Sequence, residues 1–140
     1  MKQNDELNAR GLFEGLRAPH AARSHETVRA LVEEYEWGTS VPPIVAIAFG
    51  NEWWAICGSH RLAALRSIGL KTREELVRTG RLIVVPAARL RAKALRSANV
   101  EAQEILSDPA QWTFFPRIVG VLFDLLPPKA AKALRDEERC

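Results

Sequence analysis

The sequence predicts a mixed fold of the α/β (α+β) class, in which a small mixed sheet is followed by a C-terminal helical extension. Two β-prone runs meet at Gly50-Asn51, a third apolar run covers residues 81–86, and helical periodicity dominates from residue 87 onward. With 140 residues and 47% apolar side chains, the chain can form one domain with a substantial core.

The first predicted helix follows Ser24, a residue type that commonly caps helix N-termini. Its apolar side chains lie at positions i, i+3, i+4 and i+7 and form one stripe: Val28, Leu31, Val32 and Tyr35. Trp37-Gly38 ends this helix. Residues 1–22 show only weak helical periodicity between Gly11, Gly15 and Pro19. We therefore expect a loosely ordered lead-in with room for a short helix.

A β-hairpin is predicted next. Pro42-Pro43 begins an extended run through Phe49, and Gly50-Asn51 joins it to a second run over residues 52–56. Gly and Asn tolerate the positive φ that a tight hairpin turn needs. The second run leads through Cys57-Gly58-Ser59 directly into a helix over residues 60–68, which Gly69 ends.

The rest of the chain is predicted to be mainly helical. Thr72 and Glu75 form a capping box for a short helix that Gly80 closes, and residues 81–86 form a third strand. Helical segments are expected over residues 87–98, after a turn about Asn99 through residue 106, and from Asp108-Pro109 onward, with Pro116 kinking or splitting the last of these. Pro127-Pro128 precedes a charged tail helix over residues 129–139.

The strand–turn–helix junction at Gly58 carries the main functional signal. A helix N-terminus exposes unpaired N–H groups and a partial positive charge, so a glycine turn before a helix suits an anion. Gly58 would let a phosphate approach the backbone, and Ser59, His60 and Arg61 add donor side chains. An ordinary N-cap and a solvated first turn explain the same four residues equally well, although cations at a helix N-terminus favour a bound anion.

These residues resemble the ParB/sulfiredoxin superfamily over residues 23–100. The resemblance rests on Val41-Pro42-Pro43-Ile44, on the hairpin, and on the run from Trp54 to Leu65 that contains Gly58-Ser59-His60-Arg61. It implies a ParB/sulfiredoxin-type sheet, with residues 1–22 as lead-in and residues 101–140 as a helical extension packed on it. It also implies that Gly58, Ser59, His60 and Arg61 hold a nucleotide or nucleic-acid phosphate.

Departures from the family pattern exclude two of the activities known in the family. Ser59 stands where sulfiredoxins have their catalytic cysteine, and Cys57 precedes the glycine, so peroxiredoxin repair is not expected. The partition-protein motif is matched only in part by residues 98–102, because Ala102 stands in the place of its arginine, and no helix-turn-helix follows. A full partition clamp is therefore not expected, whereas a truncated relative of the partition proteins stays an open alternative.

The first functional hypothesis is an NTPase-like or kinase-like protein that acts on ATP or CTP with Mg²⁺. The catalytic residues are unknown, because Glu33, Glu34, Glu52 and Glu101 are equally available as the carboxylate. The second is a nuclease or DNA-binding module, since residues 53–107 carry ten basic and four acidic side chains. Arg89, Lys93 and Arg96 share one face there. The third is an accessory or inhibitor protein that docks on a protein partner through the segment from Phe114 to Leu126.

Composition sets the expected location. Neither a signal peptide nor an apolar run of about 20 residues occurs, so no membrane partner is expected. The two cysteines, Cys57 and Cys140, do not form a disulfide framework, which predicts a cytoplasmic protein. His20 and His25 have no convergent acidic or cysteine partner, so no metal site is predicted.

Overall fold

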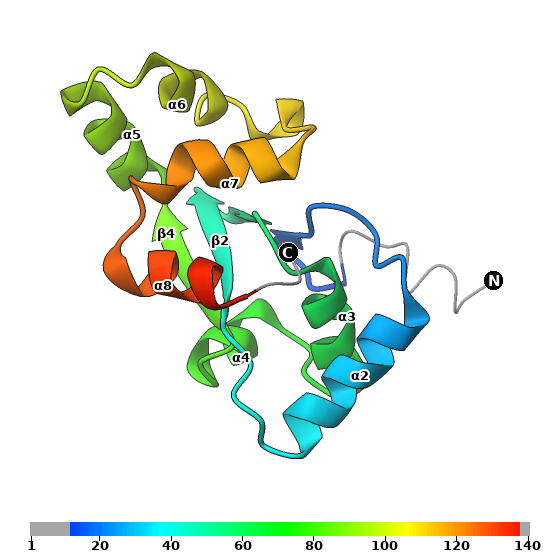
Figure 1. Cartoon of the computed structure of the whole chain (residues 1–140). Helices are drawn as coiled ribbons and strands as arrows, with labels where there is room; N and C mark the ends of the chain where they lie inside the picture. Colours follow the sequence, from blue (N-terminus) through cyan, green and yellow to red (C-terminus); the bar gives the residue numbers. More distant parts are fainter. Residues whose placement is uncertain (1–11, 138–140) are drawn as a thin grey trace.

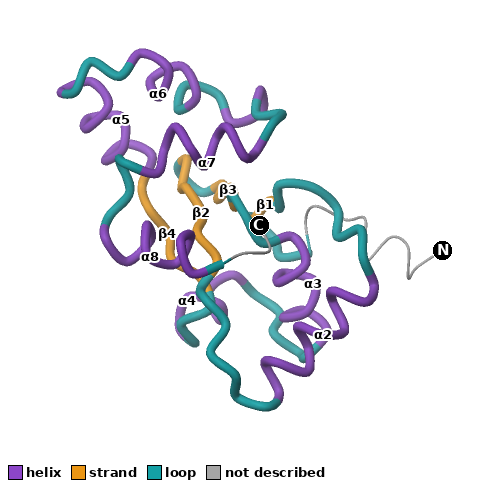
Figure 2. The backbone as a smooth tube through the Cα atoms, viewed as in Figure 1, coloured by secondary structure: helices purple, strands orange, loops and turns teal. Residues whose placement is uncertain are grey.

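A four-stranded mixed sheet forms the centre of the computed structural model, which describes residues 12–137. Its strands are β1 (Leu16–Arg17), β2 (Ile44–Phe49), β3 (Glu52–Ala55) and β4 (Leu82–Pro86), in the order β1-β3-β2-β4. β3 is antiparallel to β2, whereas β1 is parallel to β3 and β4 is parallel to β2. Figure 2 shows the strands between the helices. The predicted mixed α/β class is confirmed.

Helices cover both faces of the sheet. Because successive side chains of a strand point to opposite faces, β2 serves both cores. Ile44 and Ala46 pack with α2 (His25–Glu36), α3 (Ser59–Ser67) and α4 (Arg73–Arg78). Val45 and Ile47 pack with α5 (Ala87–Arg96), α6 (Val100–Ile105), α7 (Phe115–Phe123) and α8 (Pro128–Asp136). Figure 1 shows these two layers, and residues 101–137 thus supply much of one core.

Local signals placed several elements correctly. Ser24 Oγ accepts from the N–H of Thr27 at 3.1 Å and caps α2, and Thr72 caps α4 through the N–H of Glu75. The β2–β3 hairpin closes at Phe49↔Glu52, and of its two turn residues only Gly50 has a positive φ, +63°. These contacts confirm the predicted helix and hairpin.

Residues 12–22 differ from the expected loose lead-in. Leu16–Arg17 forms β1 on the sheet edge, and Phe13 and Leu16 are each only 1% exposed. The N–H of Trp53 donates to the carbonyl of Gly15 at 2.8 Å, and Arg73 Nη1 donates to the same carbonyl at 2.7 Å. Contacts with residues distant in sequence therefore order this segment, which is why local periodicity missed it.

The C-terminal region follows the predicted order with shorter elements. Pro109–Gln111 forms a single 3-10 turn, and α7 begins at Phe115 with Pro116 in its first turn, so proline separates the two. The tail helix, α8, ends at Asp136 rather than at residue 139, and residues 138–140 lie outside the described part of the chain. Within the described part, no helix has the length and apolar character that a membrane crossing requires.

Candidate functional site at the Gly58 turn

Gly58 is the point at which the chain leaves the sheet and enters α3. Its φ of +107° is a left-handed conformation that side chains disfavour, and no side chain caps the helix that follows. A Cβ atom built on Gly58 would lie 3.0 Å from Ile44 Cγ1 and 3.1 Å from Arg61 Nη2. Both the backbone angle and the available space therefore require glycine.

Ser59 and His60 hold the segment that precedes α2. Ser59 Oγ accepts a hydrogen bond from the N–H of His20 at 3.2 Å. His60 Nε2 accepts from the N–H groups of Arg23 and Ser24 at 3.1 and 3.2 Å. The two motif side chains thus receive three backbone N–H groups of residues 20–24 and fix this segment beside the turn.

His60 is held in its neutral form by this arrangement. Its Nε2 accepts two hydrogen bonds, so the ring proton lies on Nδ1. Burial lowers the pKa of His60 below its ordinary value, and electrostatic interaction with His20 and Arg23 lowers it further. The sequence had suggested His60 as a phosphate donor, whereas the structure uses its Nε2 as an acceptor.

Arg61 points into the protein. Its Nη1 donates to the carbonyls of Pro42 and Pro43 at 2.8 and 3.1 Å, and its Nη2 lies 3.1 Å from Cys57 Sγ. Its Nε lies 3.5 Å from Glu137 Oε2, and the residue is only 3% exposed. Arg61 therefore ties the start of β2, the turn and the end of α8 together.

Glu137, the ion-pair partner of Arg61, was not predicted from the sequence. It lies in a charged tail with no periodic signal, yet its side chain is only 1% exposed.

Cys57 differs from the sequence-based expectation that the cysteines form no disulfide framework, because it is disulfide-bonded. The chain's other cysteine, Cys140, lies outside the described residues.

A cavity of about 570 Å³ lies beside the turn. The segment before α2 forms one wall with Pro19, His20 and Arg23. The end of β3 and the turn form a second wall with Ile56, Cys57 and Gly58. The start of α7 forms a third wall with Thr113, Phe114, Phe115, Pro116 and Val119. Of the four predicted site residues, only Gly58 lines the cavity; Ser59 and His60 bind the segment that contains His20 and Arg23, and Arg61 binds the carbonyls of residues 42 and 43.

Arg23 is the one charged side chain among the described residues that line this cavity, and its charge is positive. Arg23 is exposed at its edge, and His20 Nδ1 donates to the carbonyl of Ala21 at 2.7 Å, which leaves its Nε2 available. No Asp or Glu occurs among the described residues that line the cavity. With the N-terminus of α3 at Gly58, this arrangement favours an anion over a cation.

The carboxylates considered from the sequence lie elsewhere. Glu52 pairs with Arg17 at 3.2 Å and Glu101 with Arg117 at 3.0 Å, both in exposed positions. Glu33 and Glu34 belong to α2 and do not line the cavity. Within residues 12–137, no group of three His, Cys, Asp or Glu side chains could hold a metal ion.

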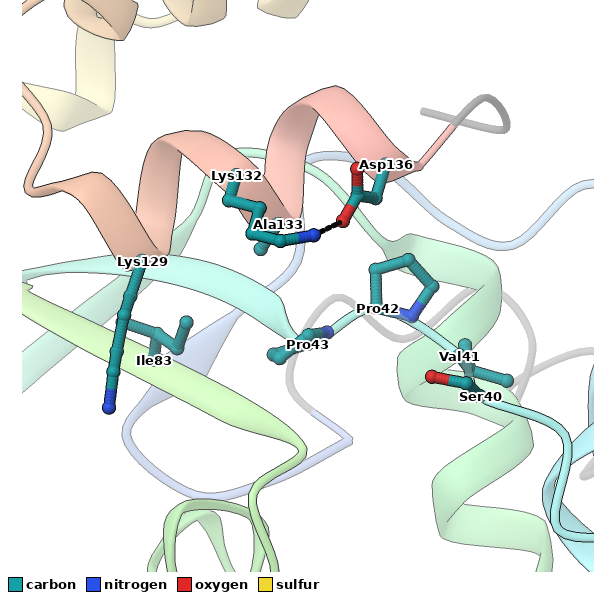
Figure 3. A pocket seen from close by; sticks show the side chains of 9 residues that line it. All are labelled: Ser40, Val41, Pro42, Pro43, Ile83, Lys129, Lys132, Ala133 and Asp136. Carbon is teal, nitrogen blue, oxygen red and sulfur yellow. Dashed lines mark hydrogen bonds and ion pairs between the residues drawn. The ribbon is translucent and has the colours of Figure 1, made fainter.

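A second cavity, of about 500 Å³, opens between α8 and residues 40–43 (Figure 3). Its cations are Lys129 and Lys132, and Lys132 pairs with Asp136 at 2.5 Å. Pro42 and Pro43, whose carbonyls bind Arg61, form part of its wall. It contains none of the predicted site residues, so Lys129 offers a cationic control position away from the Gly58 turn.

Comparison with known proteins adds no relative to this description. No protein-family model, no curated protein and no solved structure matches the chain. The resemblance to the ParB/sulfiredoxin superfamily therefore stays a prediction that rests on the motif residues, and the site must be judged by its own geometry.

Proposed function

We propose that the chain binds the phosphate groups of a nucleotide in the cavity beside Gly58. The observation that carries this proposal is the combination, in one cavity, of the Gly58 turn before α3 with His20 and Arg23 and without an acidic lining residue in the described part of the chain. Backbone N–H groups at a helix start and a nearby guanidinium both favour phosphate oxygens.

In this proposal the four motif residues have different tasks. Gly58 allows close approach of the ligand to the backbone, and Ser59 and His60 position the segment that bears His20 and Arg23. Arg61 is a positioning residue that supports the turn from inside the protein. Arg23, which the sequence did not single out, replaces Arg61 as the guanidinium nearest to the cavity.

Hydrolysis or phosphoryl transfer with Mg²⁺ and ATP or CTP stays a prediction. The described lining of the cavity offers no carboxylate to hold a magnesium ion, so its residues do not fit a protein-bound metal. Binding is thus the activity that the geometry supports best. The cytoplasmic location expected from the sequence gives this proposal no support, because that expectation assumed unpaired cysteines and Cys57 is disulfide-bonded.

The proposal is tested by isothermal titration of the pure protein with tripolyphosphate, ATP, CTP and GTP, each with and without Mg²⁺. We expect at least one of these ligands to bind. In thermal unfolding, the same ligand should raise the melting temperature by mass action. Arg23→Ala should weaken binding about tenfold or more, because a hydrogen bond to a charged group contributes about 1.5–3 kcal/mol. Lys129→Ala, at the second cavity, should leave binding unchanged.

Failure of all four ligands to bind would overturn the proposal. Equal loss of affinity in Arg23→Ala and Lys129→Ala would instead indicate nonspecific attraction to a basic protein. Short single-stranded and duplex DNA are included to test the nucleic-acid alternative, whose affinity should fall steeply with salt concentration.

The nucleic-acid alternative is favoured by one observation, the exposed basic face of α5. Arg89, Lys93 and Arg96 are exposed, although Lys93 Nζ also donates to the carbonyl of Leu125 at 3.3 Å. This face belongs to the helical layer opposite α3, so it would bind a different phosphate from the one at Gly58. The protein-partner alternative keeps only part of its surface, because Ile118, Leu122, Leu125 and Leu126 are buried in the core while Phe114 is exposed.

A further inference from the structure

An exposed phenylalanine stands at the cavity beside Gly58. Phe114 is 64% exposed, and it is the only large exposed apolar side chain among the described residues that lines this cavity. It also borders a smaller cavity of about 170 Å³, so it forms the rim between the two. Its aromatic face is therefore available to a ligand that enters from solvent.

Aromatic contacts and a hydrogen bond fix the segment that contains Phe114. Phe115 contacts the ring of Trp112 edge-on, with ring centroids 6.1 Å apart, and Trp112 Nε1 donates to the carbonyl of Ile105 at 2.7 Å. Trp112 itself is only 7% exposed. Pro116 in the first turn of α7 restricts the backbone further. A ligand would therefore meet a largely preformed aromatic wall.

A second wall of the cavity is polar, and hydrogen bonds hold it in place. His20 and Arg23 lie on the segment that Ser59 and His60 fix through its backbone N–H groups. The cavity therefore has an apolar, aromatic side and a cationic side. Its volume of about 570 Å³ lies within the range of about 300–1,000 Å³ typical of sites for small molecules.

We propose that Phe114 stacks on the base of a nucleotide whose phosphates lie toward Gly58 and Arg23. This inference rests on the function proposed above and adds to it the part of the ligand that the aromatic side recognises. A flat aromatic group joined to an anion matches both sides of the cavity, whereas polyphosphate or a sugar phosphate matches only the cationic side. The ligand class is thus a mononucleotide with its base.

The test compares ligands that share phosphates but differ in the base. Isothermal titration measures the Kd of tripolyphosphate and of the nucleotide that binds best, for wild type, Phe114→Ala and Phe114→Leu. Base stacking on an aromatic side chain contributes enough for a loss of about five- to hundredfold on substitution by alanine. We expect such a loss for the nucleotide in both variants and an unchanged Kd for tripolyphosphate.

Leu95→Ala is the matched control, because Leu95 is 70% exposed and lies on α5, away from the cavity. It should leave both dissociation constants unchanged. Circular dichroism and melting temperature establish that the Phe114 variants are folded, as expected for so exposed a side chain.

The outcomes separate this inference from the proposed function. If tripolyphosphate and the nucleotide bind equally well and Phe114→Ala changes neither, the stacking role is overturned while phosphate binding stands. If Phe114→Ala weakens both ligands equally, Phe114 acts on the structure of the site and the inference is again overturned. If no anion binds, both proposals fail. If only a single-stranded oligonucleotide shows the Phe114-dependent loss, the mononucleotide class is wrong.

Discussion

The guanidinium of Arg61 and the carboxylate of Glu137 form an ion pair inside the protein, with 3.5 Å between Nε and Oε2. Their side chains are 4% and 1% exposed, so neither charge is solvated by bulk water. The guanidinium of Arg61 also donates to the backbone carbonyls of Pro42 and Pro43, and its Nη2 lies 3.1 Å from Cys57 Sγ. A residue predicted to face a ligand is thus a junction between β2, α3 and the end of α8.

Removing one partner of this buried ion pair should lower the free energy of unfolding strongly. Arg61→Leu leaves the Glu137 carboxylate buried and two carbonyls without this donor, so we expect a loss of about 3–5 kcal/mol in the free energy of unfolding. Glu137→Gln should cost less, since an amide oxygen can still accept. The double variant Arg61→Leu/Glu137→Leu should recover part of the loss, because both buried charges of the pair are then removed together.

Urea denaturation of these variants measures the effect, and the exposed pair of Arg117 and Glu101 supplies the control. Those two side chains are 55% and 52% exposed, so Arg117→Leu should cost less than about 1 kcal/mol. If Arg61→Leu destabilised the protein no more than Arg117→Leu, the buried pair would not have the structural role assigned to it.

Gly58→Ala should destabilise the protein more than Gly80→Ala. Both glycines have a positive φ, +107° and +75°, so both substitutions incur about 1–2 kcal/mol of left-handed strain. Only at Gly58 would the new Cβ meet neighbours, at 3.0 and 3.1 Å, whereas at Gly80 nothing lies within 4 Å. Overpacking at Gly58 should lower the free energy of unfolding by a further ~1–3 kcal/mol. Equal unfolding free energies in chemical denaturation would contradict this account.

The sequence predicted most elements because their signals are local. The Ser24 cap, the apolar stripe of α2 and the Gly50 turn each involve residues only a few positions apart. The strand–turn–helix junction at Gly58 was predicted for the same reason. β1 could not be predicted, because two residues are too few for a period and long-range contacts to Trp53 and Arg73 hold the segment.

The directions of the site side chains could not be predicted from the sequence. Ser59 and His60 turn toward residues 20–24, and Arg61 turns toward residues 42–43 and 137, all far away along the chain. A motif specifies which chemical groups are available, whereas tertiary packing decides which of them face a ligand. That difference is why Arg23 and Phe114 line the cavity and Arg61 does not.

The disulfide of Cys57 yields a further prediction. Since the chain has one other cysteine, we expect non-reducing peptide mapping of the purified monomer to find the Cys57 peptide linked to the peptide that contains Cys140. Cys57→Ser should lower the melting temperature, because loss of a native disulfide typically costs about 2–5 kcal/mol. Two free thiols per chain under non-reducing, denaturing conditions, or a disulfide-linked dimer on a gel, would contradict the prediction.

Stability should fall as the pH drops below the ordinary pKa of histidine, and His60 should account for part of the fall. Its pKa is lowered in the folded protein by burial and by His20 and Arg23, so the unfolded chain takes up a proton that the folded chain resists. Stability therefore rises with pH between the lowered pKa and about 6.5, and is level above that value as far as His60 is concerned.

Thermal unfolding between pH 5 and pH 8 measures this slope. In His60→Gln, an amide oxygen can still accept from the N–H groups of Arg23 and Ser24 but does not titrate, so the variant should lose less stability than wild type on acidification. His25→Gln is the control, because it removes an exposed imidazole at the start of α2 and leaves those two N–H groups with His60. If His60→Gln kept the full wild-type slope, protonation of His60 would not oppose folding, and the neutral acceptor role assigned to its Nε2 would be wrong.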